Sequence, residues 1–240
     1  MRGNVRLFAL TAVRNEMRYL PGFVANLAAQ VDGIIVLDDG STDGSAEYLA
    51  SRPEVIELLR VPPDRPEWAE VENHRALVAG SLRHGAEWVL SVDADHRLER
   101  EFRKRCERVI RDGEPSGHMA YSVPLRELWG SPRTYRVDGI WGRKRRARLF
   151  QARADHEFDT KPLHSIKAPL QARKDGEIPV ADLVVYHLRM IRPEDRRKRR
   201  ERYQALDPEA RYQPGLGYDY LTDERGIRLE RIGPDRDYVE

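Results

Sequence analysis

The chain has 240 residues, of which 40% are hydrophobic and 34% are charged. This length suits one large domain or two small ones, and the apolar fraction is sufficient for a core. The 42 basic residues nearly balance 40 acidic residues, for a formal net charge of +2. This balance argues against a protein that grips nucleic acid over its whole surface and against a disordered acidic chain.

The cysteine content and the apolar runs indicate the cellular compartment. A single cysteine, Cys106, excludes an intrachain disulfide and a cysteine-rich zinc site, and we expect it to be a buried helix residue. The apolar run near the N-terminus is too short for a signal peptide, and no stretch of the sequence approaches the ~18 apolar residues of a membrane span. We therefore expect a soluble, cytoplasmic protein.

The first half of the chain alternates apolar runs with segments of helical spacing. The predicted strands are Val5–Val13, Gly33–Leu37, Val55–Val61 and Glu87–Val92, and the predicted helices are Met17–Gln30, a short helix ending near Ala50, Trp68–His84 and Glu99–Arg111. This alternation predicts an α/β fold with a mostly parallel, Rossmann-like sheet and helices on both faces. Such sheets bind ligands at the carboxyl ends of their strands.

The second half changes character, with short strand-like pieces separated by loops. These pieces are Ala120–Pro124, Arg148–Gln151 and Val180–His187, followed by a charged helix over Pro193–Leu206 and a tail rich in Pro, Gly and Tyr. We expect one domain over residues 1–190, with a nucleotide half (1–112) and a smaller α+β acceptor half (113–190). Residues 191–240 are expected to form a basic helix and a wrapping tail.

Two carboxylates follow a predicted buried strand in the segment SVDAD. Side chains alternate in an extended chain, so Asp93 and Asp95 point to the same side. Two close anions repel unless a cation lies between them, and carboxylate oxygens suit Mg²⁺ or Mn²⁺. Taken alone, this pattern is more often a polar turn at a strand end than a metal site.

A second acidic loop, DDGSTDGS, follows another predicted strand, Gly33–Leu37. A tight turn and a helix cap explain its Gly, Ser and Thr residues, but they do not explain two adjacent carboxylates, Asp38 and Asp39. A carboxylate at this place accepts hydrogen bonds from a base or a ribose hydroxyl in dinucleotide-binding sites.

The segments LTAVRNE, IIVLDDGSTDGS and WVLSVDAD, in this order and spacing, resemble the family 2 glycosyltransferases of the GT-A fold. The resemblance covers residues 5–112 well and continues more loosely through RARLF, LHS and YHLRM. Its nearest subgroup is the lipopolysaccharide-core type. The roles that it implies are contact with the nucleotide-sugar for Thr11, Val13, Asn15, Glu16, Asp39, Arg75 and Asp93, and metal binding for Asp95, Asp93 and His187.

The sequence departs from the family pattern at two positions, one of which bears on the catalytic base. His96 replaces the Glu of a DADE stretch, and Ser165 stands where relatives often have Glu. The acceptor hydroxyl needs a base within hydrogen-bond reach. The candidates in the second half are Asp159, which we favour, and Glu127, Asp138 and Glu157, although an acid at any one of these positions is more often a solvated surface residue than a base.

His187 ends the apolar run VADLVVYH, where a histidine is as often a satisfied core residue as a ligand. If it is a ligand, an imidazole beside carboxylates favours Mn²⁺ over Mg²⁺.

Two basic segments, Arg143–Arg148 and Arg192–Arg202, are most simply a solvated loop and a solvated helix face. The alternatives are a diphosphate clamp, an anionic acceptor site or peripheral contact with an anionic membrane.

The resemblance implies a metal-dependent glycosyltransferase that moves a sugar from a nucleotide-diphosphate sugar, with UDP-sugars favoured, to an acceptor hydroxyl with inversion. The expected partners are this donor and a glycan or small-molecule acceptor in cell-surface glycan synthesis, with no nucleic acid. Two alternatives remain open: a catalytically inert nucleotide-sugar binder or scaffold, and a sugar-1-phosphate nucleotidyltransferase. The second is disfavoured because the first loop, TAVRNE, has no glycines.

Overall fold

The computed structural model describes residues 5–65, 68–161, 165–173 and 176–240. Strands and helices alternate from residue 7 to residue 91, as the sequence predicts. The strands are β1 (Leu7–Val13), β2 (Gly33–Asp39), β3 (Val55–Val61), β4 (Trp88–Ser91), β5 (His96–Leu98), β6 (Ala120–Glu127), β7 (Thr134–Arg136), β8 (Arg145–Gln151), β9 (Val185–His187) and β10 (Leu229–Arg231). The helices are α1 (Leu20–Leu27), α2 (Ser45–Ala50), α3 (Glu70–Arg83), α4 (Phe102–Gly113) and α5 (Pro193–Leu206).

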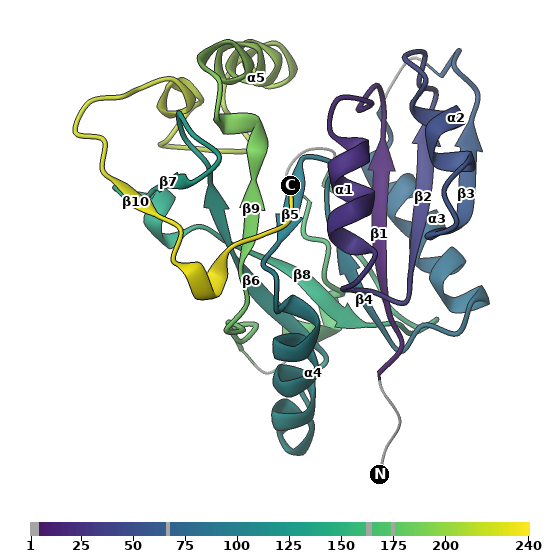
Figure 1. Ribbon diagram of the computed structural model, residues 1–240. Coiled ribbons are helices and arrows are strands. Elements are labelled where there is room, and N and C mark those ends of the chain that lie inside the picture. Colours follow the sequence, from purple (N-terminus) through teal and green to yellow (C-terminus); the bar gives the residue numbers. More distant parts are fainter. Residues whose placement is uncertain (1–4, 66–67, 162–164, 174–175) are drawn as a thin grey trace.

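Eight strands form one sheet in the order β3-β2-β1-β4-β8-β6-β9-β5 (Figure 1). The strands β3, β2, β1 and β4 are parallel, and β6 and β9 run in the same direction, whereas β8 and β5 are antiparallel to their neighbours. The prediction of a mostly parallel α/β sheet is confirmed. Because six strands share one direction, their carboxyl ends meet along one edge of the sheet.

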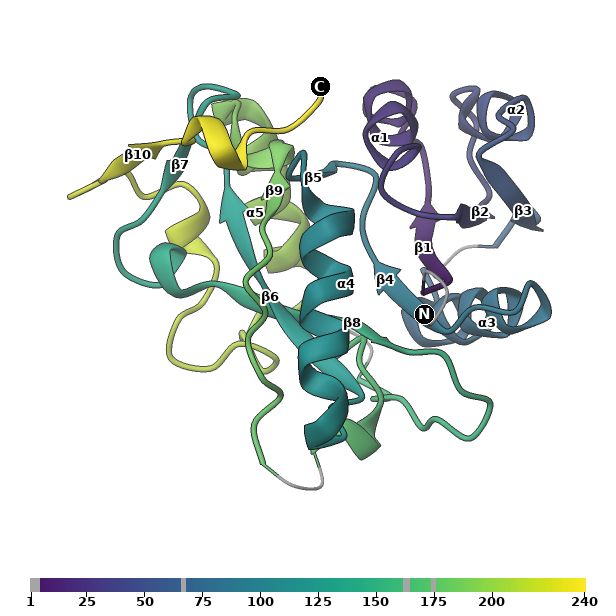
Figure 2. The same cartoon turned by 60° about the horizontal axis from the view of Figure 1, so that its bottom comes forward.

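Helices cover both faces of the sheet, since alternate residues of each buried strand point to opposite sides. On β1, Leu7 and Ala9 pack with the apolar sides of α1 and α4, whereas Phe8 and Leu10 pack with α3. Figure 2 shows α1 and α2 on one side of β1–β3 and α3 on the other. Cys106 lies fully buried in α4, as expected.

The C-terminal tail wraps back onto the sheet. β10 pairs with β7, and the Tyr238 ring packs on Tyr186 with ring centroids 5.2 Å apart. The amide of Asn26 on α1 donates to the carbonyl of Val239 at 3.2 Å, which places the chain end between α1 and β5 (Figure 1). Within the described residues, no helix has the length and apolar character needed to cross a bilayer.

Three local expectations differ from the structure. Of the strand predicted over Val180–His187, only Val185–His187 forms β9. The strand predicted at Arg148 begins at Arg145, so most of the basic run is sheet rather than loop. Because successive side chains of an extended chain point to opposite sides, those of Lys144, Arg146 and Arg148 lie on the same side. The short strand β5 was not expected, because its three residues pair only with β9, far away in sequence.

Candidate active site

Three neighbouring strands bring polar side chains together at the carboxyl edge of the sheet. His187 at the end of β9 lies in register with Glu127 at the end of β6 and with His96 at the start of β5. All three side chains are buried. Asp95 immediately precedes β5, so the strand pairing places its carboxylate beside His187.

Asp95 and His187 form the centre of this cluster. Nε2 of His187 lies 3.1 Å from Oδ2 of Asp95, whereas Oδ1 of Asp95 is buried and has no hydrogen-bond partner among the described residues. Asp95, His96 and His187 each offer one potential ligand atom, and these three atoms lie within 4.8 Å of one another. Carboxylate oxygen and imidazole nitrogen suit Mn²⁺, and a bound cation would satisfy the orphaned Oδ1.

Glu127 supports His187 from behind. Its carboxylate is fully buried and contacts Nδ1 of His187 with one oxygen and Nζ of Lys144 with the other. Burial opposes ionisation, but His187 and Lys144 hold the pKa of Glu127 well below its usual range. Burial also lowers the pKa of Lys144 to about 8, against the effect of Glu127. Burial acts to lower the pKa of His187, but Glu127 and Asp95 outweigh it and raise that pKa.

Arg189, two residues after His187, links two acids of the site. Its Nε donates to Oδ2 of Asp95, and its Nη2 donates to the carboxylate of Glu16 with a distance of 2.6 Å to Oε2. Burial raises the pKa of Glu16, and Arg189 only partly offsets this effect. The guanidinium thus neutralises acids from two different loops.

His96 occupies the position at which the DADE pattern is broken. Its Nδ1 accepts the backbone N–H of Asp93 at 3.1 Å, so the proton of the neutral ring is on Nε2, which faces Oδ2 of Asp93 at 3.5 Å. Burial lowers the pKa of His96 to about 3, so the ring is neutral. Nη2 of Arg148 donates to Asp93 at 2.9 Å. With its proton on Nε2, His96 is a hydrogen-bond donor to the acids rather than a third ligand.

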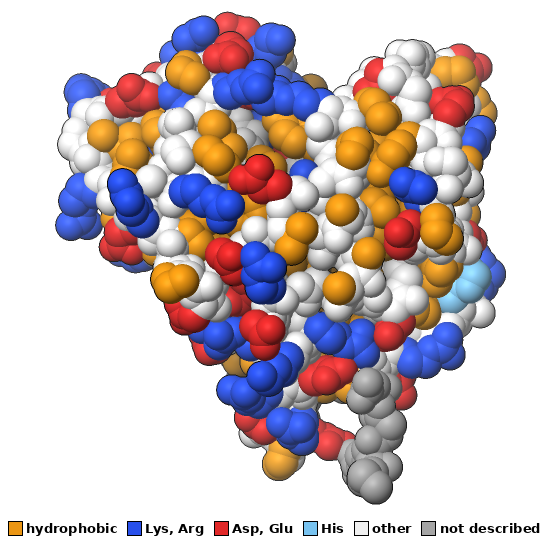
Figure 3. Space-filling model, viewed as in Figure 1, with side chains coloured by type: hydrophobic (Ala, Val, Ile, Leu, Met, Phe, Trp, Pro, Cys, Tyr) orange, Lys and Arg blue, Asp and Glu red, His pale blue; other side chains and the backbone are white. Residues whose placement is uncertain are grey.

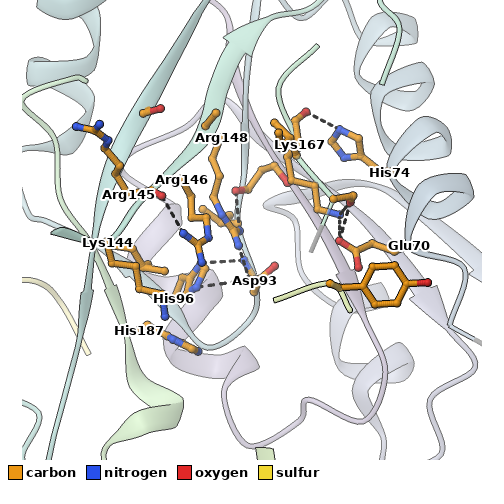
Figure 4. A pocket seen from close by; sticks show the side chains of 18 of the residues that line it. Glu70, His74, Asp93, His96, Lys144, Arg145, Arg146, Arg148, Lys167 and His187 are labelled. Carbon is orange, nitrogen blue, oxygen red and sulfur yellow. Dashed lines mark hydrogen bonds and ion pairs between the residues drawn. The ribbon is translucent and has the colours of Figure 1, made fainter. Parts of the chain in front are cut away.

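A cleft of about 1510 Å³ opens over this edge. Among the described residues, eight Lys and Arg residues line it against three Asp and Glu residues, so it favours anions. Figure 3 shows the molecule hollowed at the top, between the α5 side and the α1–α2 side, with Lys and Arg side chains gathered over α5. Figure 4 shows Lys144, just before β8, and Arg146 and Arg148 of β8 with His96, Asp93 and His187 in this cleft.

Most of the residues predicted to contact the nucleotide lie at the ends of β1 and β2 or in the loops that follow these strands. Asp39 is fully buried and pairs with Arg14 at 2.9 Å and with Arg65 at 3.4 Å. Asn15, with φ of 58°, accepts the N–H of Thr42 at 2.7 Å. The remaining residues of this set are placed as follows: Thr11 and Val13 are buried on β1, Glu16 contacts Arg189, and Arg75 is exposed on α3.

Of the predicted residues, Asp93 and His187 line the cleft, with Asp95 buried behind them. The four candidate bases are not brought together. Asp159 accepts the backbone N–H groups of Lys161 and Ile166 and so holds its own loop. The other three are placed as follows: Asp138 pairs with Arg136, Glu157 is exposed, and Glu127 is buried behind His187.

Several residues of the site were missed by the sequence analysis. Glu70 of α3 lines the cleft, and Nη1 of Arg199, within the basic segment Arg192–Arg202 but with no individual role predicted, lies 3.0 Å from Nε2 of His187. The alternation of Lys144, Arg146 and Arg148 was a usable signal, because residues two apart share one side of a strand. No local pattern marks Glu70 or Arg199.

Comparison with known proteins identifies the family of the chain. The sequence profile of the family described as Glycosyl transferase family 2 matches residues 9–159. The chain belongs to glycosyl transferase family 2. This family 2 chain is 28% identical, over 235 residues, to the uncharacterized proteins Rv3786c of Mycobacterium tuberculosis and Mb3815c of Mycobacterium bovis. The match covers 92% of the chain and 56% of either relative, so the chain spans about half the length of these relatives.

One solved structure supports the fold, and a second is reported with it. The crystal structure of S. aureus TarS matches with a TM-score of 0.50 and 13% identity, over 85% of this chain and 39% of TarS. The structure of TarS residues 1–349 in complex with UDP-GlcNAc matches with a TM-score of 0.42 and 17% identity, over 53% of this chain and 36% of that chain. The first of these likenesses identifies the GT-A fold and nothing more specific.

Proposed function

We propose that this family 2 chain is a metal-dependent glycosyltransferase that transfers a sugar from a nucleotide-diphosphate sugar, with UDP-sugars favoured, to an acceptor hydroxyl with inversion. The observation that carries the proposal is the buried Asp95–His187 pair with its orphaned carboxylate oxygen. This pair lies at the carboxyl edge of the sheet, where open α/β sheets bind ligands, beside a cleft rich in Lys and Arg.

The residues present fit a divalent cation. Asp95 and His187 would hold it directly, with Asp93 near the same position, and Mn²⁺ is favoured by the mixed oxygen and nitrogen donors. When bound, such an ion offsets the negative charge that develops on the leaving diphosphate. Arg146 and Arg148 add positive charge from β8, and Glu127 holds the His187 ring in orientation.

The first two loops would hold the nucleotide. Asn15, Glu16 and Asp39 lie after β1 and at the end of β2, at the same edge of the sheet as Asp93. The carboxylate of Asp39 is buried, and Arg14 and Arg65 contact its two oxygens, so a base or ribose bound here would share these oxygens with the arginines. Arg75 would lie further out on α3, near the nucleotide.

Two finer assignments belong to the same proposal. The acceptor is a glycan or small molecule in cell-surface glycan synthesis, an assignment supported only by the motif resemblance. Peripheral contact with an anionic membrane through the exposed basic side chains of α5 is compatible with their position at the mouth of the cleft (Figure 3).

The test is to mix the protein with Mn²⁺ and a panel of nucleotide-diphosphate sugars and to measure free nucleotide diphosphate. We expect slow release from one donor, which is lost in Asp95→Asn and kept in the control Asp112→Asn, an exposed acid of α4. Donor binding without release would instead indicate an inert binder. Release of pyrophosphate from a nucleoside triphosphate and a sugar phosphate would indicate a nucleotidyltransferase.

A further inference from the structure

Glu70, the first residue of α3, points its carboxylate into the cleft (Figure 4). Its Oε1 accepts hydrogen bonds from Oγ of Ser165 at 2.8 Å and from Nζ of Lys167 at 2.7 Å. No hydrogen bond to its Oε2 is found within the described residues. One oxygen therefore holds the side chain in place, and the other is available to a ligand.

The segment that holds Glu70 is itself attached to α3. The backbone carbonyl of Lys167 contacts Nε2 of His74, one turn further along the helix, at 2.9 Å. Burial lowers the pKa of His74 to about 3, so the ring is neutral and donates this hydrogen bond. The carboxylate is therefore held from both sides, by its own helix and by the segment packed against it.

Other carboxylates near the cleft are less suited to take the proton from the hydroxyl group of the sugar acceptor. Three acids line it in the part of the chain that the structure describes: Glu70, Asp93 and Glu177. Asp93 is bonded to Arg148 and contacts His96, and the side chain of Glu177 is 91% exposed at the rim. Glu127 is buried with both oxygens occupied. Asp93 also has one oxygen without a hydrogen bond from a described residue, but its side chain is 54% exposed and lies on the His187 side, whereas the side chain of Glu70 is fixed and only 18% exposed.

The position of Glu70 also suits an inverting reaction. In Figure 4 Asp93 lies between Glu70 on one side and His187 and Lys144 on the other. A diphosphate held at the Asp95–His187 side would leave away from Glu70. An acceptor hydroxyl beside Glu70 would therefore attack the sugar from the face opposite the leaving group.

We infer that Glu70 is the catalytic base of this transferase, an assignment that rests on the proposed function. The acceptor oxygen forms a bond to the anomeric carbon while the bond from that carbon to the diphosphate oxygen breaks. The bonding pair leaves with the nucleotide diphosphate, and the hydroxyl proton moves to Oε2 of Glu70. Ser165 and Lys167 hold Oε1, so the carboxylate keeps its orientation through the transfer.

The test compares Glu70→Gln with Glu72→Gln, an exposed acid in the first turn of the same helix. Donor turnover to water or to acceptor is measured, together with calorimetric binding of UDP in the presence of Mn²⁺. We expect Glu70→Gln to lower kcat roughly 100- to 10,000-fold. UDP affinity should stay within about threefold, because binding of the leaving nucleotide does not use the base. Glu72→Gln should match the wild type.

A further readout separates catalysis from a structural role. In Glu70→Ala, added formate should restore part of the turnover, since a small carboxylate can enter the vacated space. Wild-type kcat in Glu70→Gln, or an equal loss of UDP binding and kcat, would overturn the assignment. A wild-type protein that neither binds nor turns over any donor would overturn the transferase proposal itself, and this assignment with it.

Discussion

Glu127 and His187 lie side by side at the ends of β6 and β9, with the buried carboxylate against Nδ1 of the ring. This contact directs Nε2 of His187 toward Asp95. A carboxylate behind a ligating histidine fixes the orientation of the ring and raises its basicity as a ligand. The strand register therefore fixes the orientation of the His187 ring in the absence of a ligand.

Replacing Glu127 by Gln should lower the affinity for Mn²⁺ by about 10- to 100-fold, because the ring loses its anionic partner. The measurement is isothermal titration with Mn²⁺, alongside thermal unfolding, since Lys144 also loses its counter-charge. Glu101→Gln, at the exposed start of α4, is the matched control. Unchanged Mn²⁺ affinity in a folded Glu127→Gln protein would show that His187 does not depend on this contact.

Arg189→Gln should increase the affinity for Mn²⁺ in the absence of nucleotide. The guanidinium donates to Asp95 and to Glu16, so a metal ion must compete with it for the same carboxylate. Hydrogen bonds to charged groups contribute about 1.5–3 kcal/mol, which corresponds to a gain on the order of 10-fold or more. The control is the same Mn²⁺ titration of Arg18→Gln, which replaces an exposed arginine that pairs with Asp195. Weaker binding in Arg189→Gln would contradict competition.

Mn²⁺ affinity should rise with pH and continue to rise above pH 6.5, the ordinary value for histidine. Glu127 and Asp95 outweigh burial and raise the pKa of His187, so the ring is protonated on both nitrogens below that raised value. The ion pairs of this ring stabilise the metal-free protein below pH 6.5, and that contribution is lost as pH rises through the raised pKa. In His187→Gln, Mn²⁺ titrations between pH 6 and 8.5 should show little of this pH dependence of the affinity. An equal dependence in the variant would assign it to another group.

Cys106 should be unreactive toward iodoacetamide in the native protein at pH 8. Burial raises the pKa of its thiol to about 12, and the side chain is fully enclosed in the core. Mass spectrometry should detect the adduct only after unfolding in guanidinium chloride. Rapid labelling without denaturant would show that α4 opens readily.

Asn26→Ala should lower the free energy of unfolding by about 3 kcal/mol, because buried backbone groups lose their partners. The amide of Asn26 donates to the carbonyls of Leu98 and Val239 and accepts the N–H of Leu98 at 2.7 Å. Urea unfolding measures the loss, with Ala29→Ser at an exposed position as the control. Limited proteolysis should release the C-terminal residues faster in Asn26→Ala, and equal rates would contradict a tethering role.

Much of the architecture follows from local patterns. The strands predicted at residues 33–37 and 55–61 and the helix Pro193–Leu206 appear at nearly the predicted positions. Apolar periodicity identifies such elements because each one buries a continuous face. The polar loops after β1, β2 and β4 could also be placed, since parallel strands carry their ligand-binding residues at one edge.

The charge pairings could not be predicted in this way. Glu127 was a candidate base in the sequence, but its pairing with His187, sixty residues away, buries both of its oxygens. Arg189 had no predicted role, yet it contacts Glu16 from the opposite end of the chain. Neither contact leaves a periodic signal, because each depends on which strands become neighbours.

The sequence by itself determined the alternation of strands and helices and the loops that carry acids, because periodicity and turn residues act over a few positions. Only the tertiary structure decided which acid meets which cation, which histidine faces Asp95 and which carboxylate keeps an oxygen free in the cleft. The physical reason is that a charge is stabilised by whatever lies within a few ångströms in space, and the register between distant strands sets that neighbourhood.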